Sequence, residues 1–253
     1  MAQSDRIEQQ ADWDSMWQDL EDTEDLDAEE RTLRLQIQME LVRDHLGSPT
    51  GLKVIEIGAG RSTNALLFAR AGANATVLDY SPTALEQSKQ RFAARSLDVE
   101  VVEADVFDLP PDLRGRFDVS MSFGLCEHFL GERRLGVIKA HLDLVHSGGL
   151  VIINVPHRYS PIYRAWMGVS KWRGTWVLGT EVPFSASEIK RLAREAGGRP
   201  LRPRHIAALA TFVNQGPNNV LRRLGRPLLP VPQVAIPGLD FFAYDLMQPI
   251  IKP

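Results

Sequence analysis

Residues 54–81 constrain the fold of this chain more than any other stretch. They read VIEIGAGRSTNALLFARAGANATVLDYS: an apolar run, a glycine-rich turn, a helix-like segment and a second apolar run that ends in Asp79. Short apolar runs bounded by turn residues are typical of strands that are covered on both faces. The order predicts two parallel strands joined by a helix, with a nucleotide held at the glycine-rich turn.

The same alternation of strand and helix continues from residue 52 to about residue 156. Strands are predicted over residues 52–58, 74–80, 99–105, 117–124 and 149–156, with helices between them. Ser62 or Thr63 is expected to cap the helix that follows the first strand. Strands that alternate with helices indicate an α/β fold, a parallel sheet with helices on both faces. Functional side chains in such sheets lie beyond the carboxyl ends of the strands.

The flanking segments complete one predicted domain, residues 1–253. An amphipathic helix is predicted over 31–47, after an acidic stretch. Within the acidic stretch, Trp13, Met16, Trp17 and Leu20 recur at helical spacing. The acidic stretch is therefore either a solvated arm or a helix that covers the site. A helix capped by Ser185 and strands over 201–210 and 239–249 are predicted near the end of the chain. The expected parts are a helical N-terminal arm (1–48), a cofactor-binding core (50–156), an aromatic insert (157–184) and the C-terminal part of the sheet (185–253).

Bulk properties exclude several classes of protein. The net charge of −3 gives no basic excess of the kind that nucleic-acid binding requires. No apolar run approaches the roughly 20 residues that span a bilayer. The N-terminus lacks the cationic and apolar parts of a secretory signal. Cys126 is the single cysteine, which excludes an internal disulfide and suits a reducing compartment. A cytoplasmic location is therefore expected.

The glycine-rich turn discriminates between nucleotides. The dinucleotide fingerprint G-x-G-x-x-G places a third glycine where this chain has Thr63. Glu56 precedes the turn, and a carboxylate there would repel a diphosphate but suit an ammonium group. Asp79 ends the second strand, where an acid accepts hydrogen bonds from ribose hydroxyls. A nucleoside with a cationic tail is predicted, and an NAD(P)-dependent oxidoreductase is the disfavoured alternative.

These features resemble the class I S-adenosylmethionine-dependent methyltransferases. VIEIGAGRS resembles their first motif, VLDYS the end of strand two, EADVFDLP the third-strand motif, FDVSMSFGLCEHF the fourth-strand segment and HSGGLVIINVP the fifth strand. The resemblance covers about residues 50–156. It implies a Rossmann-like, doubly wound, mostly parallel sheet with an antiparallel last strand, a helical N-terminal extension and an aromatic-rich insert. The implied cofactor is S-adenosyl-L-methionine.

The resemblance also implies a set of cofactor-binding residues. Glu56 would orient the ammonium group, Asp79 would hold the ribose, and Asp105 would accept a hydrogen bond from the adenine amine. The alternative for Asp105 is a cap of a turn. The full implied set is Glu56, Gly58, Ala59, Gly60, Asp79, Tyr80, Asp105, Val106 and Phe123.

Candidate catalytic residues follow the fourth and fifth strands. His128 is predicted as the general base, with Glu127 orienting it or the acceptor, because the unperturbed pKa of histidine lies near 6.5. Supporting the fold or contacting cofactor is the alternative role of this pair. His157 is the second candidate base. Metal ligands are unknown, although Mg²⁺ could assist by lowering the pKa of an alcohol, with Glu181 among the candidate ligands.

The insert at 157–184 combines aromatic with basic side chains. A lid over an acceptor pocket is its first predicted role, a homodimer interface the second and a membrane-surface patch the third. The predicted function is methylation of a hydroxyl on a small molecule, either a sugar or glycoside or a secondary metabolite. Alternatives are N-, C- or carboxyl-methylation of a small metabolite or lipid quinone, and a non-catalytic cofactor-binding partner protein. Nucleic acid is not an expected partner.

Overall fold

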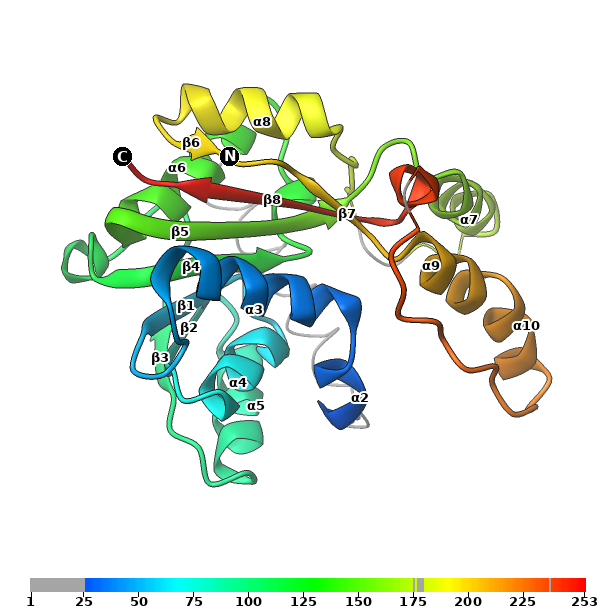
Figure 1. The fold of residues 1–253 in the computed structure, drawn as a ribbon, viewed down its shortest axis with the longest axis horizontal. Helices are drawn as coiled ribbons and strands as arrows, with labels where there is room; N and C mark the ends of the chain where they lie inside the picture. Colours follow the sequence, from blue (N-terminus) through cyan, green and yellow to red (C-terminus); the bar gives the residue numbers. More distant parts are fainter. Residues whose placement is uncertain (1–25, 175, 177–179, 237) are drawn as a thin grey trace.

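A computed structural model of the chain describes residues 26–174, 176, 180–236 and 238–253. The helix predicted around Trp13 and Trp17 lies outside the described residues. An eight-stranded sheet forms the centre, and helices cover both of its faces (Figure 1).

The sheet has the order β3-β2-β1-β4-β5-β8-β6, and β7 also pairs with β8. The first five strands, β1 to β5, run parallel to one another, and β8 runs antiparallel to β5. The predicted fold class, including the antiparallel last strand, is therefore confirmed. The strands are β1 (Lys53–Ile57), β2 (Asn74–Asp79), β3 (Glu100–Glu103), β4 (Phe117–Phe123), β5 (Val145–Pro156), β6 (Arg199–Pro200), β7 (Arg204–Ile206) and β8 (Asp245–Ile251).

Two hydrophobic cores lie on opposite faces of the sheet. Helices α3, α4 and α5 cover one face, and α6 and α8 cover the other (Figure 1). Among the described residues, no helix has both the length and the apolar character needed to cross a membrane. The α-helices are α2 (Leu26–Glu30), α3 (Leu33–Leu46), α4 (Thr63–Arg70), α5 (Pro82–Ala93), α6 (Glu132–Leu144), α7 (Pro161–Trp172), α8 (Ala186–Glu195), α9 (Ala208–Gln215) and α10 (Pro217–Arg223), and the 3₁₀ turns are η1 (Pro111–Leu113), η2 (Cys126–His128) and η3 (Leu239–Phe242).

Two strands predicted in the C-terminal part of the chain have different bounds in the structure, and β5 begins at Val145, four residues before its predicted start. The strand predicted over 201–210 is limited to β7, because Ala207 adopts a left-handed conformation with φ of 57° and α9 begins at the next residue. Asp240 accepts a hydrogen bond from the backbone N–H of Ala208 at 3.0 Å, which stabilises that helix start. The strand predicted over 239–249 begins only at Asp245, after η3.

Side-chain caps set the starts of several helices. Ser81 and Ser185 accept hydrogen bonds from the backbone N–H groups of Ala84 and Glu188, so the cap predicted at Ser185 is confirmed. The capping position predicted at Ser62 or Thr63 is confirmed at Ser62, but the expected side-chain hydrogen bond is not formed. Ser62 adopts a left-handed conformation there.

Candidate functional site

The glycine-rich turn follows β1 and leads into α4. Gly58 and Gly60 have φ values of 59° and 47°, in the left-handed region that favours glycine. A Cβ at Gly58 would lie 2.6 Å from Cδ1 of Leu125, so the turn also packs closely against the segment after β4. The backbone N–H of Ala59 donates to the Leu78 carbonyl at 3.3 Å. The turn therefore presents bare backbone at the carboxyl end of the sheet, as a ligand approaching closely requires.

Asp79 is buried at the end of β2 and braces the same turn. Its Oδ2 accepts a hydrogen bond from the Gly60 N–H at 3.0 Å, and its Oδ1 accepts one from the Ser81 N–H at 3.0 Å. A carboxylate at the end of this strand is the kind of acceptor that ribose hydroxyls bind. This arrangement fits the predicted ribose contact, which remains a prediction.

Glu56 is the residue that caps α4. Its Oε2 accepts a hydrogen bond from the Ala65 N–H at 2.7 Å, and its Oε1 accepts one from Nδ2 of Asn64 at 3.1 Å. Burial raises the pKa of this carboxyl to about 7, although these two hydrogen bonds and the nearby Arg34 oppose the shift. Both carboxylate oxygens of Glu56 thus hold the start of α4, and the contact with the cofactor ammonium stays a prediction.

The remaining cofactor candidates line the ends of β2, β3 and β4. Asp105 is half-buried, and its Oδ1 accepts a hydrogen bond from the Phe107 N–H at 2.9 Å, so its turn-capping role is confirmed. Val106 beside it is buried, while Tyr80 and Phe123 are half-buried. Their contacts with adenine remain predictions.

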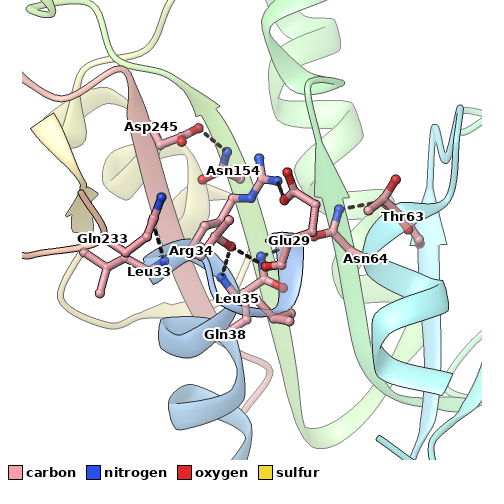
Figure 2. A network of polar contacts seen from close by, with 12 residues as sticks. Glu29, Leu33, Arg34, Leu35, Gln38, Thr63, Asn64, Asn154, Gln233 and Asp245 are labelled. Atoms are coloured by element: carbon pink, nitrogen blue, oxygen red, sulfur yellow. Dashed lines mark hydrogen bonds and ion pairs between the residues drawn. The ribbon is translucent and has the colours of Figure 1, made fainter. Parts of the chain in front are cut away.

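Arg34 is a candidate site residue that the sequence did not indicate. It extends from the first turn of α3 toward β5 and β8, between Glu29 and Asn154 (Figure 2). Its Nη2 pairs with the Glu29 carboxylate at 2.9 Å, and its guanidinium lies 5.9 Å from the Phe123 ring centroid. No motif surrounds this arginine, so only the packing of α3 on the sheet places it here. A guanidinium near the glycine-rich turn suits the carboxylate of an amino-acid moiety.

Glu127 lies in η2, directly beyond β4, and is only 2% exposed. Its Oε2 is buried without a hydrogen-bond partner among the described residues. Burial raises the pKa of the Glu127 carboxyl to about 8, and the charges of Glu181 and Asp245 raise it further. The raised pKa means that this group exchanges a proton near neutral pH.

A buried acidic cluster surrounds Glu127. Glu181 is 4% exposed and accepts a hydrogen bond from the Tyr163 hydroxyl, while its Oε2 has no partner in the described structure. Burial raises the pKa of Glu181 and, well above its usual range, that of Tyr244. Asp245 accepts a hydrogen bond from Nδ2 of Asn154 at 2.8 Å. Buried unpaired oxygens of this kind are costly and suit a site that receives hydrogen-bond donors from a ligand.

His128 is half-buried beside this cluster. Its Nδ1 lies 2.9 Å from the Thr180 carbonyl oxygen, so the ring donates a hydrogen bond there. Burial lowers the pKa of His128, and backbone carbonyls of Thr180 and Gly124 oppose that shift. The imidazole is therefore held by the backbone in its neutral form, and its predicted role as the base is not decided by this geometry.

His157 follows β5 and is fully buried. Its ring centroid lies 4.5 Å from that of His205 and 5.4 Å from that of Phe241. Burial first, and the neighbouring His205 second, lower the pKa of His157 to about 4. Its role as a second base stays a prediction, and its surroundings are those of a packed aromatic cluster.

Three further features near the site are the cysteine, the possible metal ligands and the aromatic insert. Cys126 is fully buried, and burial raises its thiol pKa, as expected of a small core residue. Within the described part of the chain, no group of three or more His, Cys, Asp or Glu side chains could hold a metal ion. The aromatic side chains of the insert differ in burial: Tyr163 and Phe184 are fully buried, whereas Trp172 is 83% exposed.

Comparison with known proteins agrees with this geometry. A model of a methyltransferase domain matches residues 54–149. The ubiquinone biosynthesis O-methyltransferase of Erwinia tasmaniensis is 26% identical over 184 residues, which cover 68% of this chain and 71% of the relative. The demethylmenaquinone methyltransferase of Clavibacter sepedonicus is 33% identical over 103 residues, 41% of this chain and 40% of the relative.

Solved structures share the fold. The magnesium protoporphyrin IX methyltransferase from Synechocystis, crystallised with S-adenosylhomocysteine, aligns with a TM-score of 0.59 and 15% identity, covering 87% of this chain and 81% of that one. The 1,6-didemethyltoxoflavin-N1-methyltransferase of Burkholderia thailandensis aligns with a TM-score of 0.56 and 19% identity, covering 98% of this chain and 86% of that one. The matched methyltransferase domain, the sheet order and these similarities together identify the protein as an S-adenosylmethionine-dependent methyltransferase of small molecules.

Proposed function

We propose that this methyltransferase methylates a hydroxyl group of its small-molecule acceptor, and that Glu127 receives the hydroxyl proton. The supporting observation is a buried carboxyl with an unpartnered oxygen and a pKa of about 8, directly beyond β4. General-base catalysis is most efficient when the pKa of the base lies near the working pH. An alcohol must lose its proton during transfer, whereas many carbon and nitrogen acceptors need less help.

The chain's own groups divide the work of binding and positioning. S-adenosylmethionine supplies the methyl group as an activated sulfonium. Asp79 would hold its ribose, Asp105 its adenine and Arg34 its carboxylate, each through a charged hydrogen bond. The turn at Gly58 and Gly60 provides close backbone approach. Positioning of acceptor against methyl then supplies much of the rate.

His128 takes a positioning role in this proposal, which reverses the roles expected from the sequence. Its ring is held by the Thr180 carbonyl, and the same segment continues into Glu181. The backbone N–H of Val182 donates to the Glu127 carbonyl at 2.9 Å. His128 therefore fixes the segment that brings Glu181 to Glu127.

A phenolic hydroxyl is the first acceptor to test, because one similar protein is named as an O-methyltransferase of ubiquinone biosynthesis. Sugars, glycosides and other secondary metabolites follow. The cytoplasmic location and a homodimer also remain predictions, and Mg²⁺ dependence is tested by adding EDTA to the same assays.

The decisive assay follows transfer of a labelled methyl group to a panel of dihydroxybenzoates and glycosides. Glu127→Gln should lower kcat by roughly 100-fold or more, the usual contribution of a general base. The affinity for S-adenosylhomocysteine should stay unchanged. In the wild type, kcat should rise with pH up to about 8, as Glu127 ionises.

His128→Asn is the companion variant. It should lower kcat less than Glu127→Gln does and should leave the pH profile in place. A pH profile lost in His128→Asn and retained in Glu127→Gln would return the role of base to His128. Transfer only to amines or carbon acceptors would reject the hydroxyl proposal altogether.

A further inference from the structure

Exposed apolar side chains gather on one part of this protein. We call it the outer arm and define it as α7, α9, α10 and residues 224–242. Helix α7 packs against α9, and α9 packs against α10 and η3. Figure 1 shows these helices beyond the carboxyl end of β5, apart from the helices that flank the sheet.

The outer arm holds 11 of the 14 large hydrophobic side chains that are exposed among the described residues. Trp172 is 83% exposed, Leu224 65%, Val220 57% and Phe212 54%. Single exposed hydrophobic residues need no explanation, but a concentration of them marks a surface that another body covers.

The same part of the chain is basic. The outer arm carries five Lys and Arg against one Asp or Glu. Asp240 is the one acidic residue between positions 196 and 244. Its carboxylate accepts hydrogen bonds from the backbone of Ala208 at 3.0 Å and Ile236 at 2.8 Å, so it serves the fold of the outer arm.

Basic and apolar residues alternate at the end of α10. Arg222, Leu224, Arg226 and Leu228 follow one another at every second position, and all four are exposed. A surface of this composition is suited to a partner that has negative charges on its outside and an apolar layer beneath them.

The backbone under these side chains is held in place. Asn218 is fully buried; its Nδ2 donates to the Leu229 carbonyl at 3.0 Å, and its Oδ1 accepts from the Leu229 N–H at 2.7 Å. Further along, Oε1 of Gln233 accepts from the Leu33 N–H at 2.9 Å, one residue from Arg34 (Figure 2). The outer arm is thus a formed surface tied to the helix that borders the catalytic site.

We propose that the outer arm docks this enzyme on an anionic membrane surface. Arginines would meet the lipid headgroups, and Leu224 and Leu228 would enter the boundary between headgroups and acyl chains. A second copy of the chain is the less suitable occupant, because two basic surfaces related by symmetry repel each other. Nucleic acid would use the arginines but leave the exposed leucines without a role.

Co-sedimentation of the purified full-length protein with lipid vesicles tests the proposal without any measurement of activity. Vesicles of phosphatidylcholine containing about one third phosphatidylglycerol should sediment the protein, and vesicles of phosphatidylcholine alone should not. Because each basic residue near an anionic surface contributes to binding, Arg222→Glu with Arg226→Glu should lower the partition coefficient by roughly tenfold or more. Raising the salt concentration should have the same effect.

The apolar variant is Leu224→Ser with Leu228→Ser, which should also lower the partition coefficient by roughly tenfold. The matched control is Leu130→Ser with Arg194→Glu, an exposed leucine and an exposed arginine outside the outer arm. It should bind like the wild type. Thermal midpoints establish that each variant is folded.

Four results would overturn the proposal. The first is no sedimentation with either vesicle, and the second is an equal loss in the control variant. The third is binding that depends on the arginines alone, which would indicate a general polyanion site. The fourth is a concentration-dependent dimer, seen by light scattering, that the leucine variant abolishes.

Discussion

Asp79 has an observed role in the fold and a predicted role in binding the ligand. Its carboxylate oxygens accept hydrogen bonds from the backbone N–H groups of Gly60 and Ser81, which braces the glycine-rich turn. The place of Asp79 at a strand end made it predictable from the sequence. Comparing two substitutions, to alanine and to asparagine, separates its support of the turn from its predicted binding of the ribose.

Asp79→Ala should weaken binding of S-adenosylhomocysteine by about 1–3 kcal/mol, because charged hydrogen bonds to the ribose are lost. Asp79→Asn keeps one acceptor oxygen and should lose less. Calorimetric titration measures both affinities, and thermal denaturation monitors the turn. An unchanged dissociation constant for Asp79→Ala would remove this residue from the ribose site.

Glu127 makes stability depend on pH in a direction opposite to that of most carboxyls. Its folded-state pKa of about 8 lies above the ordinary value of 4.5, so the unfolded chain releases this proton first. Stability is therefore lost as pH rises from about 4.5 to 8. Glu127→Gln should stabilise the protein at pH 8 by roughly 2–5 kcal/mol and leave it unchanged at pH 5.

Urea denaturation of both proteins at pH 5, 6.5 and 8 gives these free energies. Glu56, with a pKa of about 7, adds a smaller slope of the same sign that the variant keeps. Equal pH dependence in wild type and variant would show that Glu127 ionises as an ordinary exposed carboxyl.

Among the elements, α4 shows how a local capping signal can be overridden. Ser62 stands where a capping residue is expected, yet Glu56 from β1 receives the Ala65 N–H. The strand and the helix are thereby joined by one buried carboxyl. Glu56, the acid of the first motif, therefore has a role in the fold that is independent of its predicted contact with the cofactor.

Glu56→Ala should lower the free energy of unfolding by about 1–3 kcal/mol, the cost of a lost cap and an unsatisfied buried N–H. Glu56→Gln retains an acceptor and should lose less than half as much. Chemical denaturation at pH 7 compares them. A loss of equal size in both variants would mean that the negative charge, and not the hydrogen bond, holds α4.

At the scale of the whole molecule, the predicted cofactor site is built from elements on both halves of the sheet, so binding should stabilise the fold as a unit. A ligand that binds only the folded state at 100 times its dissociation constant stabilises that state by about 2.7 kcal/mol. S-adenosylhomocysteine should therefore raise the melting temperature of a protein of this size by roughly 5–10 °C. Differential scanning fluorimetry with NAD as the matched control should show no shift, and a shift with NAD alone would contradict the cofactor assignment.

Sequence alone was sufficient for the parallel core and for the identity of the cofactor, while the residues that bind it stay a prediction. β-strand ends, glycine turns and their acids lie within continuous motifs, so Asp79 and Asp105 could be located from the residues that flank them. Strand ends in the C-terminal part were less predictable: β7 and β8 have different bounds because Ala207 and the turn at η3 interrupt the apolar runs.

What the sequence determined by itself is the fold class, the first five strands and the cofactor, because periodicity and turn chemistry are local properties of the chain. Tertiary structure alone decided the position of Arg34 and the meeting of Glu127 with Glu181, Tyr163 and Asp245. These side chains come from distant segments, and only packing on the sheet brings them together. Burial, which raises the pKa of Glu127, is a property of that packing, so no local pattern could have indicated it.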